Sequence, residues 1–451
     1  MSIHPADSEI FGALWSTAEM RALFAESNHL QLMLEVEAGL ARAQAGLGLI
    51  PREAAEAITR AARVENLELE RVAEGARQSG VPVPALVSEL SRVAGEEAAR
   101  HVHLGATTQD ILDTALVLQM RRAFEFVRRD LVALARALAE RAREFRDTPM
   151  AARTNMQQAV PTTFGLKCAV WAAPLCDHVE RLDQVARRVL VVQFGGAAGT
   201  LAALGGNGIA VAQALARELG LDAPDLPWHV RREGVAEAVS LLGLIGGSLA
   251  KFAVDIRLLM QTEVGEVFEP HAEGRGGSST MPQKRNPVGA EHIVAAARQV
   301  QALVPVMLAA MAQEQERAMG PWQSESLALP QSFALCAGAL AHAIEIATGM
   351  TIDAERMRRN LELGGGLIMA EAVASGLTPV MGRAGAQRAL RRVADRAIGG
   401  RKTLAQALRE DAEVRGHLDE AQIDRLLEPA SYLGSAGTLV DRVVARIARL
   451  G

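Results

Sequence analysis

The chain has 451 residues, of which 49% are apolar, and a formal net charge of −5 at pH 7. This length suits two or three domains of about 150 residues each, and the mildly acidic charge gives no indication of a nucleic-acid groove or a membrane surface. Only 3% of the residues are aromatic, while alanine, leucine, arginine and glutamate dominate, a balance that favours helices over sheets.

The cysteines and the N-terminus indicate a cytoplasmic protein. Cys168, Cys176 and Cys336 stand apart without the spacing of a metal or redox motif, so we expect reduced thiols, no disulfide and no metal site. The first residues, MSIHPADSEIFGALWS, carry charge and a proline where a signal peptide needs a basic start and an apolar run. We also expect no membrane-spanning segment, because no uninterrupted apolar run is long enough.

Short helices are predicted for residues 1–104. Ser27 and Asn28 precede LQLMLEVEAGLARAQAGLG, whose leucines and alanines lie on one stripe, and Gly46 and Gly48 end that stripe. Pro51 then opens a second helix. Further on, Gly80, Pro82 and Pro84 interrupt the chain. We therefore expect a small helical domain over residues 1–104.

Long helices are predicted for residues 105–352. Between residues 106 and 148 there is neither glycine nor proline, and a helix of that extent is roughly 60 Å long. Its apolar residues at three- and four-residue steps are Leu112, Leu116, Met120, Phe124 and Val127. Similar helices are predicted at 161–190, 230–265, 288–319 and 331–350. Helices of this length need neighbours along their apolar faces, which indicates a bundle.

Two features of these long helices bear on association. Glycines within them, at Gly165 and from Gly243 to Gly247, weaken a helix by about 1 kcal/mol each, and we expect close approach between helices to compensate. The long apolar stripes favour association of several chains through the bundle. A single chain that folds its helices into a closed bundle would give the same pattern.

After residue 352 the predicted helices shorten again. The segments IDAERMRRNLELGGG, AEAVASGL, RKTLAQALREDAEV and DEAQIDRLLEPASYLG alternate with turn residues. They describe a second small helical domain over residues 353–451. The sequence thus predicts an all-α fold of three helical domains, with a central long-helix bundle over residues 105–352.

Three polar clusters lie where long helices begin or end. The first is HVHLGATTQD, from His101 to Asp110. Thr107 and Thr108 are natural N-cap residues, Asp110 suits a first helical turn, and the N–H groups at such a terminus bind carboxylates. An ordinary helix cap explains the same residues, and His101 and His103 could equally be buried polar residues.

The second cluster is RTNMQQAVPTT, from Arg153 to Thr163, with Pro161 at the expected start of a helix. Arg153 and Gln158 are donors suited to an anionic ligand, although a polar loop would contain the same residues. Elsewhere, Arg232 and Arg317 could clamp carboxylates, or lie on solvated helical faces.

The third cluster is GRGGSSTMPQKRNPVG, from Gly274 to Gly289. Its glycines allow positive φ, and Pro282 and Pro287 fix φ and withhold N–H groups, so it cannot form the middle of a helix. Hydroxyls, an amide and a cation on a short loop between helices suit a lid over an anionic substrate. A plain connection between helices is the alternative.

These clusters carry a resemblance to a known family. HLGATTQDILDTAL, RTNMQQAVPTTFG and GSSTMPQKRNP resemble, in order, the three signature regions of the fumarase/aspartase superfamily. The intervening VVQFGGAAGTLAALG, LPWH, QTEVGEVFEP, QERAMGPW and EPASYLG are similar to its bacterial 3-carboxy-cis,cis-muconate cycloisomerases. The resemblance covers essentially the whole chain.

The resemblance implies a homotetramer in which each active site draws on three subunits and needs no cofactor. It implies that Ser278 transfers the proton, that Lys284 and Asn286 bind and polarise a substrate carboxylate, and that Thr107 and Thr108 contact it. The other candidate substrate-binding residues are His103, Arg153, Gln158, Arg232, Ser279, Met281 and Arg317. The implied reaction converts 3-carboxy-cis,cis-muconate, a small polyanion, to 4-carboxymuconolactone in protocatechuate breakdown.

Three departures from the family leave the substrate open. Gln158 stands where many relatives carry histidine, so it can hydrogen-bond but cannot carry a proton at neutral pH. Asn155 and Gly234 stand near positions where the related cycloisomerases have tryptophan and arginine. A sulfonate could replace the 3-carboxylate of the substrate. Adenylosuccinate lyase or another lyase of the superfamily is the alternative enzyme, and a non-catalytic helical scaffold is the alternative of another class.

Overall fold

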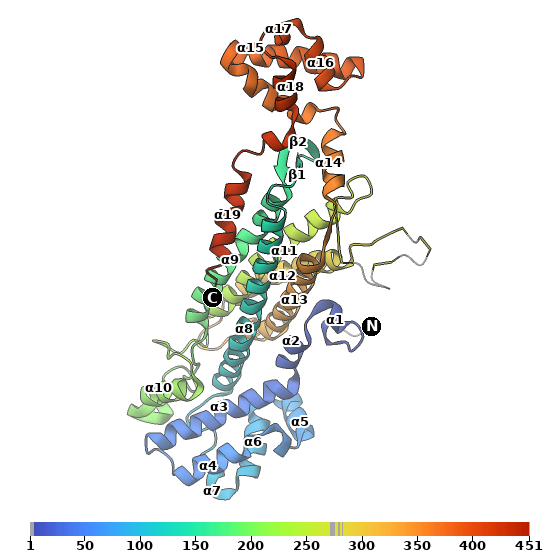
Figure 1. Ribbon diagram of the computed structural model, residues 1–451. Coiled ribbons are helices and arrows are strands. Elements are labelled where there is room, and N and C mark those ends of the chain that lie inside the picture. The colour runs from blue at the N-terminus through green and yellow to red at the C-terminus, as the bar shows by residue number, and fades with distance from the viewer. Residues whose placement is uncertain (1–3, 271–275, 278–279, 282, 451) are drawn as a thin grey trace. The chain divides into compact units, whose positions relative to one another are not determined.

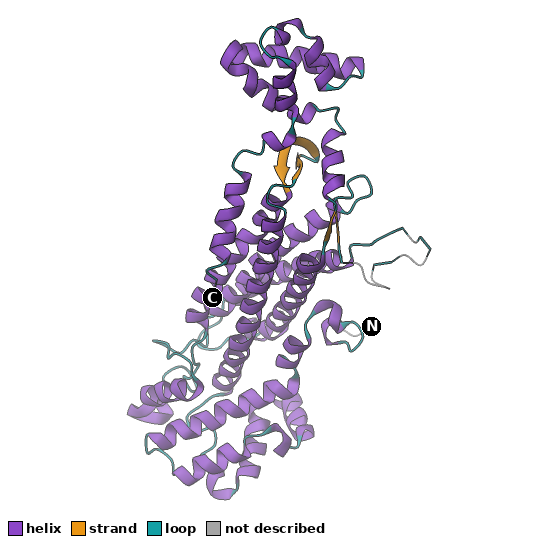
Figure 2. Cartoon of the chain, in the orientation of Figure 1, coloured by secondary structure: helices purple, strands orange, loops and turns teal. Residues whose placement is uncertain are grey.

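The computed structural model describes residues 4–270, 276–277, 280–281 and 283–450. Helices dominate, and the strands form two short two-stranded sheets (Figures 1 and 2). The prediction of an all-α fold is confirmed. Residue contacts divide the chain into two compact units. Unit 1 comprises Met1–Asp130, His178–Leu249 and His292–Ala341, and unit 2 comprises Leu131–Asp177, Ala250–Glu291 and His342–Gly451. The division into three domains stays a prediction.

The N-terminal helices of unit 1 follow the turn residues of the sequence. They are α1 (Gly12–Trp15), α2 (Ala18–Leu23), α3 (Glu26–Gly46), α4 (Arg52–Ala61), α5 (Leu69–Ser79), α6 (Val83–Ala94) and α7 (Glu96–Ala99). Pro51 caps α4, and Gly80 ends α5 at a φ of 76°. Helix α3 begins before Ser27 and Asn28 rather than after them, because Asn28 turns its side chain back to donate to the carbonyl of Leu23, at 2.7 Å.

The predicted long helices are present, but several of their boundaries differ. They are α8 (Thr108–Glu144), α9 (Phe164–Val189), α11 (Glu233–Leu259), α12 (Val288–Ala310) and α13 (Pro321–Gly349), with the shorter α10 (Gly208–Leu219) between α9 and α11. Helix α12 ends nine residues before Met319. Helix α13 begins ten residues before the predicted start and contains Pro330. A proline costs a helix one hydrogen bond, and burial of Leu329 and Phe333 beside it offsets that loss.

The apolar stripe of α8 is partly buried as predicted. Met120, Phe124 and Val127 are at most 3% exposed, whereas Leu112 and Leu116 are only half-buried. The ring of Phe124 lies 5.7 Å from that of Phe333 on α13, which in turn stacks on Phe24 at 5.8 Å. Aromatic contacts of this kind fix how helices pack within unit 1.

Glycines bring α11 and α12 close together in unit 1. A Cβ on Gly243 would lie 2.8 Å from Cγ2 of Val304, and one on Gly246 would lie 3.4 Å from Cα of Ala297. The missing side chains therefore allow the close approach that the sequence predicted. The same holds in unit 2, where a Cβ on Gly165 would lie 2.6 Å from the carbonyl oxygen of Ala142.

The second polar cluster forms a β-hairpin rather than a loop and helix cap. Strands β1 (Pro149–Thr154) and β2 (Gln157–Thr163) pair antiparallel, with a bulge between Ala151 and Arg153. Pro161 lies opposite Ala151 inside β2, so its prediction as a helix start is wrong. A two-residue turn with positive φ at both positions matches strand twist, and Asn155 and Met156 adopt φ of 48° and 65°.

The rest of unit 2 combines an aromatic row with shorter helices. Phe145, Phe164, Trp171 and Phe252 contact one another edge to face, at centroid distances of 5.6, 6.0 and 5.2 Å. Strands β3 (Val267–Phe268) and β4 (Thr351–Ile352), which lie far apart in the sequence, pair antiparallel as the second sheet. The C-terminal helices are α14 (Ala354–Glu362), α15 (Ala370–Gly400), α16 (Leu404–Glu410), α17 (Ala412–Arg415), α18 (Glu420–Leu427) and α19 (Ala436–Ile447).

Helix α15 is longer than the short segments predicted there. It joins two helical stretches across Gly382, whose φ of 67° and ψ of 159° break the helical path. The described residues also form five short 3-10 helices: η1 (Pro5–Asp7), η2 (Val64–Asn66), η3 (Ala202–Asn207), η4 (Leu367–Met369) and η5 (Pro429–Ser431).

Three helices, α11, α12 and α13, are long and apolar enough to cross a membrane by length and composition alone. The bent pair of α14 with Leu367–Gly400 adds a fourth candidate by the same measure. The expectation of no membrane-spanning segment stays a prediction, because these helices qualify by length and composition alone. Of the most apolar stretch, 56% is buried in α11, 67% in α13 and only 39% in α12.

We expect Gly165→Ala to lower the free energy of unfolding by about 1–3 kcal/mol, because its Cβ would meet backbone atoms that cannot move aside. Gly399→Ala is the matched control, since Gly399 lies near the end of α15 and has nothing within 4 Å of its Cβ. It should be neutral or stabilising by up to about 1 kcal/mol. Urea unfolding followed by circular dichroism measures both, and equal effects would contradict the packing argument.

Candidate active site

The predicted site residues fall into two sets, one in each unit. Unit 1 holds the first set, which consists of His103, Thr107, Thr108, Arg232 and Arg317, and unit 2 holds the second, which consists of Arg153, Gln158, Met281, Lys284 and Asn286. The predicted proton-transfer residue Ser278 and its neighbour Ser279 lie outside the described residues. The roles predicted for all of these residues stay predictions.

The carboxylate of Asp110 organises the first polar cluster. Asp110 is 0% exposed and lies in the first turn of α8. Its Oδ1 accepts hydrogen bonds from Nε2 of Gln193 and the backbone N–H of Gly195, and lies 2.7 Å from Nε2 of His229. Its Oδ2 accepts from the N–H groups of Thr107 and Gly196. One buried carboxylate thus receives five donors, which is favourable for a charge taken out of water.

These contacts join three segments of the sequence. Asp110 belongs to HLGATTQD, Gln193 and Gly195 belong to VVQFGGAAG, and His229 belongs to LPWH. The prediction that Asp110 belongs to the first helical turn is confirmed, and Thr107 precedes the first residue of α8, Thr108. The role of Asp110 as the common acceptor was missed, because four of its five partners lie more than 80 residues away in the sequence.

Arg317 lies beside the first turn of α8. Its Nη1 donates to Oε1 of Gln109, at 2.8 Å, and its Nη2 donates to the carbonyl of Ala197, also at 2.8 Å. Gln109 is buried and donates in turn to Asp113 and to the carbonyl of His229. These contacts leave Arg317 with further N–H groups for an anion, and they place its charge at the helix end that favours negative groups.

Arg232 is buried between two carboxylates. The side chain is 1% exposed, its Nη1 and Nη2 donate to Asp113 at 2.7 and 3.0 Å, and its Nε donates to Glu325 at 2.9 Å. Burial alone would lower the pKa of Arg232, but Asp113 and Glu325 raise it above its ordinary value. The face of the guanidinium covers the ring of Trp228 at 4.7 Å. In this structure Arg232 positions its neighbours, and a substrate would have to displace a carboxylate to reach it.

A cavity of about 450 Å³ lies beside this ion pair in unit 1. Asp113, Glu325 and Trp322 line it, together with Leu112 and Leu116, the half-buried residues of α8. Trp322 donates from Nε1 to Oδ1 of Asp113, at 3.2 Å. Two carboxylates against one arginine leave this wall with a net negative charge, which is unfavourable for a polyanion.

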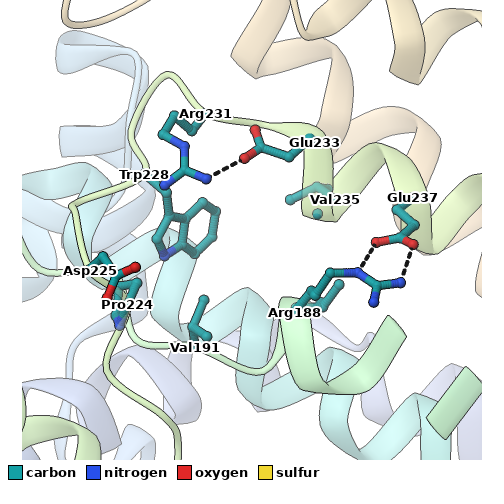
Figure 3. Close-up of a pocket in the computed structure, with 11 residues that line it drawn as sticks. Arg188, Val191, Pro224, Asp225, Trp228, Arg231, Glu233, Val235 and Glu237 are labelled. Carbon is teal, nitrogen blue, oxygen red and sulfur yellow. Dashed lines mark hydrogen bonds and ion pairs between the residues drawn. The ribbon is translucent and has the colours of Figure 1, made fainter. Parts of the chain in front are cut away.

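A second pocket in unit 1, of about 270 Å³, contains Gly234. Figure 3 shows two ion pairs at its edge, Arg231 with Glu233 and Arg188 with Glu237, and the indole of Trp228 on its wall. A Cβ on Gly234 would have no neighbour closer than 3.6 Å. The effect of the departure at Gly234 on the choice of substrate stays a prediction.

His103 contacts a buried acid that sequence reasoning missed. Its Nδ1 lies 2.6 Å from Oε1 of Glu37 on α3, and Glu37 is 1% exposed. Burial alone would lower the pKa of His103, but the hydrogen bond and charge of Glu37, with the charge of Asp110, raise it above its ordinary value. The one sequence signal for this contact is a glutamate on the apolar stripe of α3, and the helical pattern alone does not assign it a partner.

In unit 2, Arg153 and Gln158 belong to one network around Glu266. Arg153 donates from Nη1 and Nη2 to the two carboxylate oxygens of Glu266, at 2.9 and 2.6 Å. Asn360 donates to Glu266 at 2.7 Å, and its own carbonyl accepts from Nε2 of Gln158 at 2.7 Å. Glu266 is 0% exposed. The network fixes the amide of Gln158 at the hairpin and leaves its oxygen free to accept a hydrogen bond.

Lys167 lies near the same network. Burial lowers the pKa of Lys167, and the charges of Lys251 and Arg153 act in the same direction against the opposing charges of Asp255 and Glu266. Its Nζ lies 3.9 Å from Oδ2 of Asp255. No sequence motif marks this lysine as a candidate site residue.

The described part of the third cluster is held by backbone contacts. Asn286 donates from its N–H to the carbonyl of Gly276, at 2.8 Å, and Gly276 adopts a φ of 62°. Lys284 is exposed, bonds through its N–H to the carbonyl of Met281, and makes no ion pair with any residue in the described ranges. The prediction of an irregular segment with positive φ is confirmed here.

A buried carboxylate caps the helix that follows. Glu269 is 5% exposed and accepts from the N–H groups of Gly289 and Ala290 in the first turn of α12, at 3.0 and 2.8 Å. This carboxylate therefore already satisfies two N-terminal donors of α12. Within the described residues, no group of three or more histidine, cysteine, aspartate or glutamate side chains could hold a metal ion.

We expect Asp110→Asn to lower the free energy of unfolding by about 3 kcal/mol, because the amide replaces one acceptor oxygen and the buried donors lose their charge-assisted bonds. Asp183→Asn is the control in the same unit. Asp183 is 47% exposed in its pair with Arg128, so its loss should change the free energy by about 0.5 kcal/mol or less. A urea midpoint unchanged by Asp110→Asn would contradict the role assigned to this carboxylate.

Comparison with known proteins places the chain in a family. Residues 15–302 match the family model described as Lyase, and residues 366–443 match the model of the adenylosuccinate lyase C-terminus. The chain is 47% identical to a 3-carboxy-cis,cis-muconate cycloisomerase of Pseudomonas aeruginosa, over 100% of this chain and 99% of that protein. It is also 43% identical to a nitrosuccinate lyase of Streptomyces davaonensis, over 97% of this chain and 94% of that protein.

A solved structure agrees with this relationship. The crystal structure of the 3-carboxy-cis,cis-muconate lactonizing enzyme from Pseudomonas putida matches with a TM-score of 0.94 and 44% identity, over 98% of this chain and 100% of that one. The matched lyase model covers more than half of the chain and contains all three polar clusters. The chain therefore belongs to the lyase family of the fumarase/aspartase superfamily, and it has the fold of the lactonizing enzymes.

Proposed function

We propose that this protein is a cofactor-independent cycloisomerase that converts 3-carboxy-cis,cis-muconate to 4-carboxymuconolactone, in the protocatechuate branch of the β-ketoadipate pathway. The observation that carries the proposal is the 47% identity to such an enzyme over the full length of both chains. The described parts of the three polar clusters support it, since each brings donors for an anion to the end of a helix or hairpin.

The chemistry requires a site that stabilises negative charge. A carboxylate oxygen of the muconate adds to the conjugated double bond, the electrons move towards the distal carboxylate, and a proton is then delivered to carbon. The intermediate is costly because one carboxylate holds a second negative charge. Each well-placed donor stabilises such a species by about 3–4 kcal/mol, and we assign this role to Lys284, Asn286, Thr107 and Thr108.

The exposed cation of Lys284 suits this role. It is not neutralised by any acid in the described ranges, whereas Arg153 is already paired with Glu266. We assign proton transfer to Ser278, which donates in the lactonising direction and accepts in reverse. An unperturbed serine is a weak acid and base, so a nearby cation must stabilise its ionised form. Gln158 can position a carboxylate through its amide but cannot exchange a proton.

We also propose a homotetramer whose active sites each draw on three subunits. Large apolar side chains remain exposed on the long helices, among them Leu244 on α11, Leu308 on α12 and Leu327 on α13, with 56%, 52% and 76% exposure. Contact between long helices of several chains would cover them. The substrate is a small polyanion, and no nucleic-acid or membrane partner is part of the proposal.

We place the protein in the cytoplasm. Cys168, Cys176 and Cys336 are free and buried. Burial raises the pKa of Cys168 above its ordinary value and raises that of Cys336 to about 12. Free thiols of this kind are usual in a reducing compartment.

The alternative is a lyase that expels a group from a succinate. The 43% identity to a nitrosuccinate lyase and the match to the adenylosuccinate lyase C-terminus favour keeping it as the second candidate. Both candidate reactions need the same donors to stabilise a carbanion. The cycloisomerase and the lyase are therefore distinguished by which substrate is turned over.

A turnover comparison tests the proposal directly. We expect 3-carboxy-cis,cis-muconate to be consumed with a kcat/KM at least about tenfold above those of 3-sulfomuconate, unsubstituted muconate, nitrosuccinate and adenylosuccinate, because a site built for three carboxylates loses binding when one is absent or altered. Loss of the diene absorbance follows lactonisation, and nitrite or fumarate release reports the lyase reactions. Preferential turnover of either succinate would replace the first candidate with the second.

Substitutions in the third cluster test the assigned roles. We expect Lys284→Met to lower kcat by about 10²- to 10³-fold, because the developing charge loses a cation, and we expect Ser278→Ala to lower it at least as much. Arg285→Met is the matched control, since Arg285 lies over the ring of Phe268 at 5.6 Å and has no assigned role. Equal losses for Lys284→Met and Arg285→Met would indicate a general loss of loop structure.

A mixing experiment tests the shared sites. Refolding a mixture of Ser278→Ala and Thr108→Val chains should give activity that neither variant has alone, because some sites then receive both intact residues from different subunits. Light scattering should show four chains per particle. A particle of one chain with full activity would exclude the shared sites.

A further inference from the structure

One buried acid in unit 1 is not explained by folding alone. Glu37 lies in the middle of α3 and is 1% exposed. One carboxylate oxygen, Oε1, lies 2.6 Å from Nδ1 of His103. The other, Oε2, is buried and has no hydrogen-bond partner. A buried carboxylate with one bare oxygen is unfavourable unless a full positive charge faces it.

His103 is the group that can supply this charge. Its Nδ1 faces Glu37, and its Nε2 has no partner among the described residues, while the side chain keeps 21% of its surface exposed. The imidazole ring therefore has one nitrogen held inside the protein and one available outside. A carboxylate on Nδ1 fixes the orientation of the ring and favours the doubly protonated form.

The backbone around His103 is held in an unusual conformation. His103 adopts a φ of 61°, in the left-handed region that side chains other than glycine seldom occupy. The next residue, Leu104, is tied to α3 because its carbonyl accepts from Nε2 of Gln44, at 2.7 Å. Gln44 lies seven residues after Glu37, on the same face of the helix. Two side chains of α3 thus hold the turn that leads into α8.

The charges around His103 are dominated by acids. Glu37 on α3 contacts it, and Asp110 on α8 acts on it through space, and together they raise the pKa of His103 against the lowering effect of burial. The other histidine of the turn, His101, adds no negative charge. The two acids lie on different helices, α3 and α8, and each of them favours the imidazolium form of His103.

We propose that Glu37 is a positioning residue that holds His103 as an imidazolium, with its Nε2–H available to a carboxylate of the substrate at the start of α8. The proposal rests on the proposed function, because it assigns the anion as the muconate. Thr107 and Thr108 follow His103 by four and five residues, and a helix N-terminus also favours anions. Glu37 itself does not contact the substrate. It sets the charge and the direction of the group that does.

The consequence is a binding cation that exists only below the pKa of His103. Since Glu37 raises that pKa, the cation persists to higher pH than an ordinary histidine would allow. Removing the carboxylate lowers the pKa, so substrate binding should be lost at lower pH. A residue with only a structural role would change the amount of folded enzyme and leave this pH dependence in place.

The kinetic test uses Glu37→Gln, which keeps the shape and an acceptor oxygen but removes the charge. We expect the alkaline limb of kcat/KM to move to lower pH by about one unit or more. Above the midpoint of this limb, we expect the KM of Glu37→Gln to rise about tenfold. Its kcat should stay within about twofold of the wild-type value, as for loss of a binding contact. Glu37→Asp should restore part of the wild-type midpoint, and His103→Asn should abolish the limb.

Glu89→Gln is the matched control. Glu89 is also a buried acid of the N-terminal helices, 3% exposed, but it pairs with Arg92 and lies on α6. The substitution removes a buried carboxylate without touching His103. It should lower stability while leaving the alkaline limb where it is in the wild type.

A titration without substrate separates this proposal from the proposed function. In protein labelled with ¹³C at the histidine Cε1, the signal lost in His103→Asn should titrate at lower pH in Glu37→Gln than in the wild type. Equal midpoints would overturn the pairing, whatever the substrate is. A shifted midpoint with an unshifted KM profile would overturn the link to substrate binding. If no muconate is turned over but the midpoint shifts, the proposed function fails and the charged Glu37–His103 pair stands.

Discussion

The buried carboxylate of Asp110 is the interaction on which the first half of the site depends. It accepts hydrogen bonds from Thr107, Gln193, Gly195, Gly196 and His229. These bonds fix the start of α8 against two segments that come much later in the sequence. An acceptor with two oxygens can satisfy this many donors only when all of them converge on it. The same contacts that relieve its burial therefore determine where the N-terminal end of α8 lies.

Unit 2 uses buried acids in the same way. Glu266 holds Arg153 and Asn360, and Asn360 in turn fixes the amide of Gln158. Glu269 accepts from the first turn of α12, immediately after the segment that carries Lys284 and Asn286. In each case a carboxylate inside the protein orients donors that belong to a polar cluster. Among the described residues no acid pairs with Lys284, and its exposed charge is the one that we propose for the substrate.

The sequence predicted the helices well and the partners of its polar residues poorly. The periodicity of α8 and the turn at Gly80 are local features of the sequence. The close contacts of α11 depend on glycines, which have no side chain. The sequence pattern alone therefore reveals all three. The β1–β2 hairpin was missed because its turn, Asn155–Met156, lacks the usual glycine. The predicted start of a helix at residue 331 is wrong because α13 continues through Pro330, where burial of the neighbouring Leu329 and Phe333 preserves it. The contacts of Asp110, Glu37 and Glu266 cross more than 60 residues of sequence, and no local pattern encodes them.

The burial of Cys168, Cys176 and Cys336 has a consequence for the chemistry around the protein. Catechols oxidise readily to quinones, and quinones alkylate exposed thiolates. The three thiols are shielded from solvent, and burial disfavours their ionised form. Thiols of this kind react slowly with electrophiles, so we expect the folded protein to resist covalent modification by quinones.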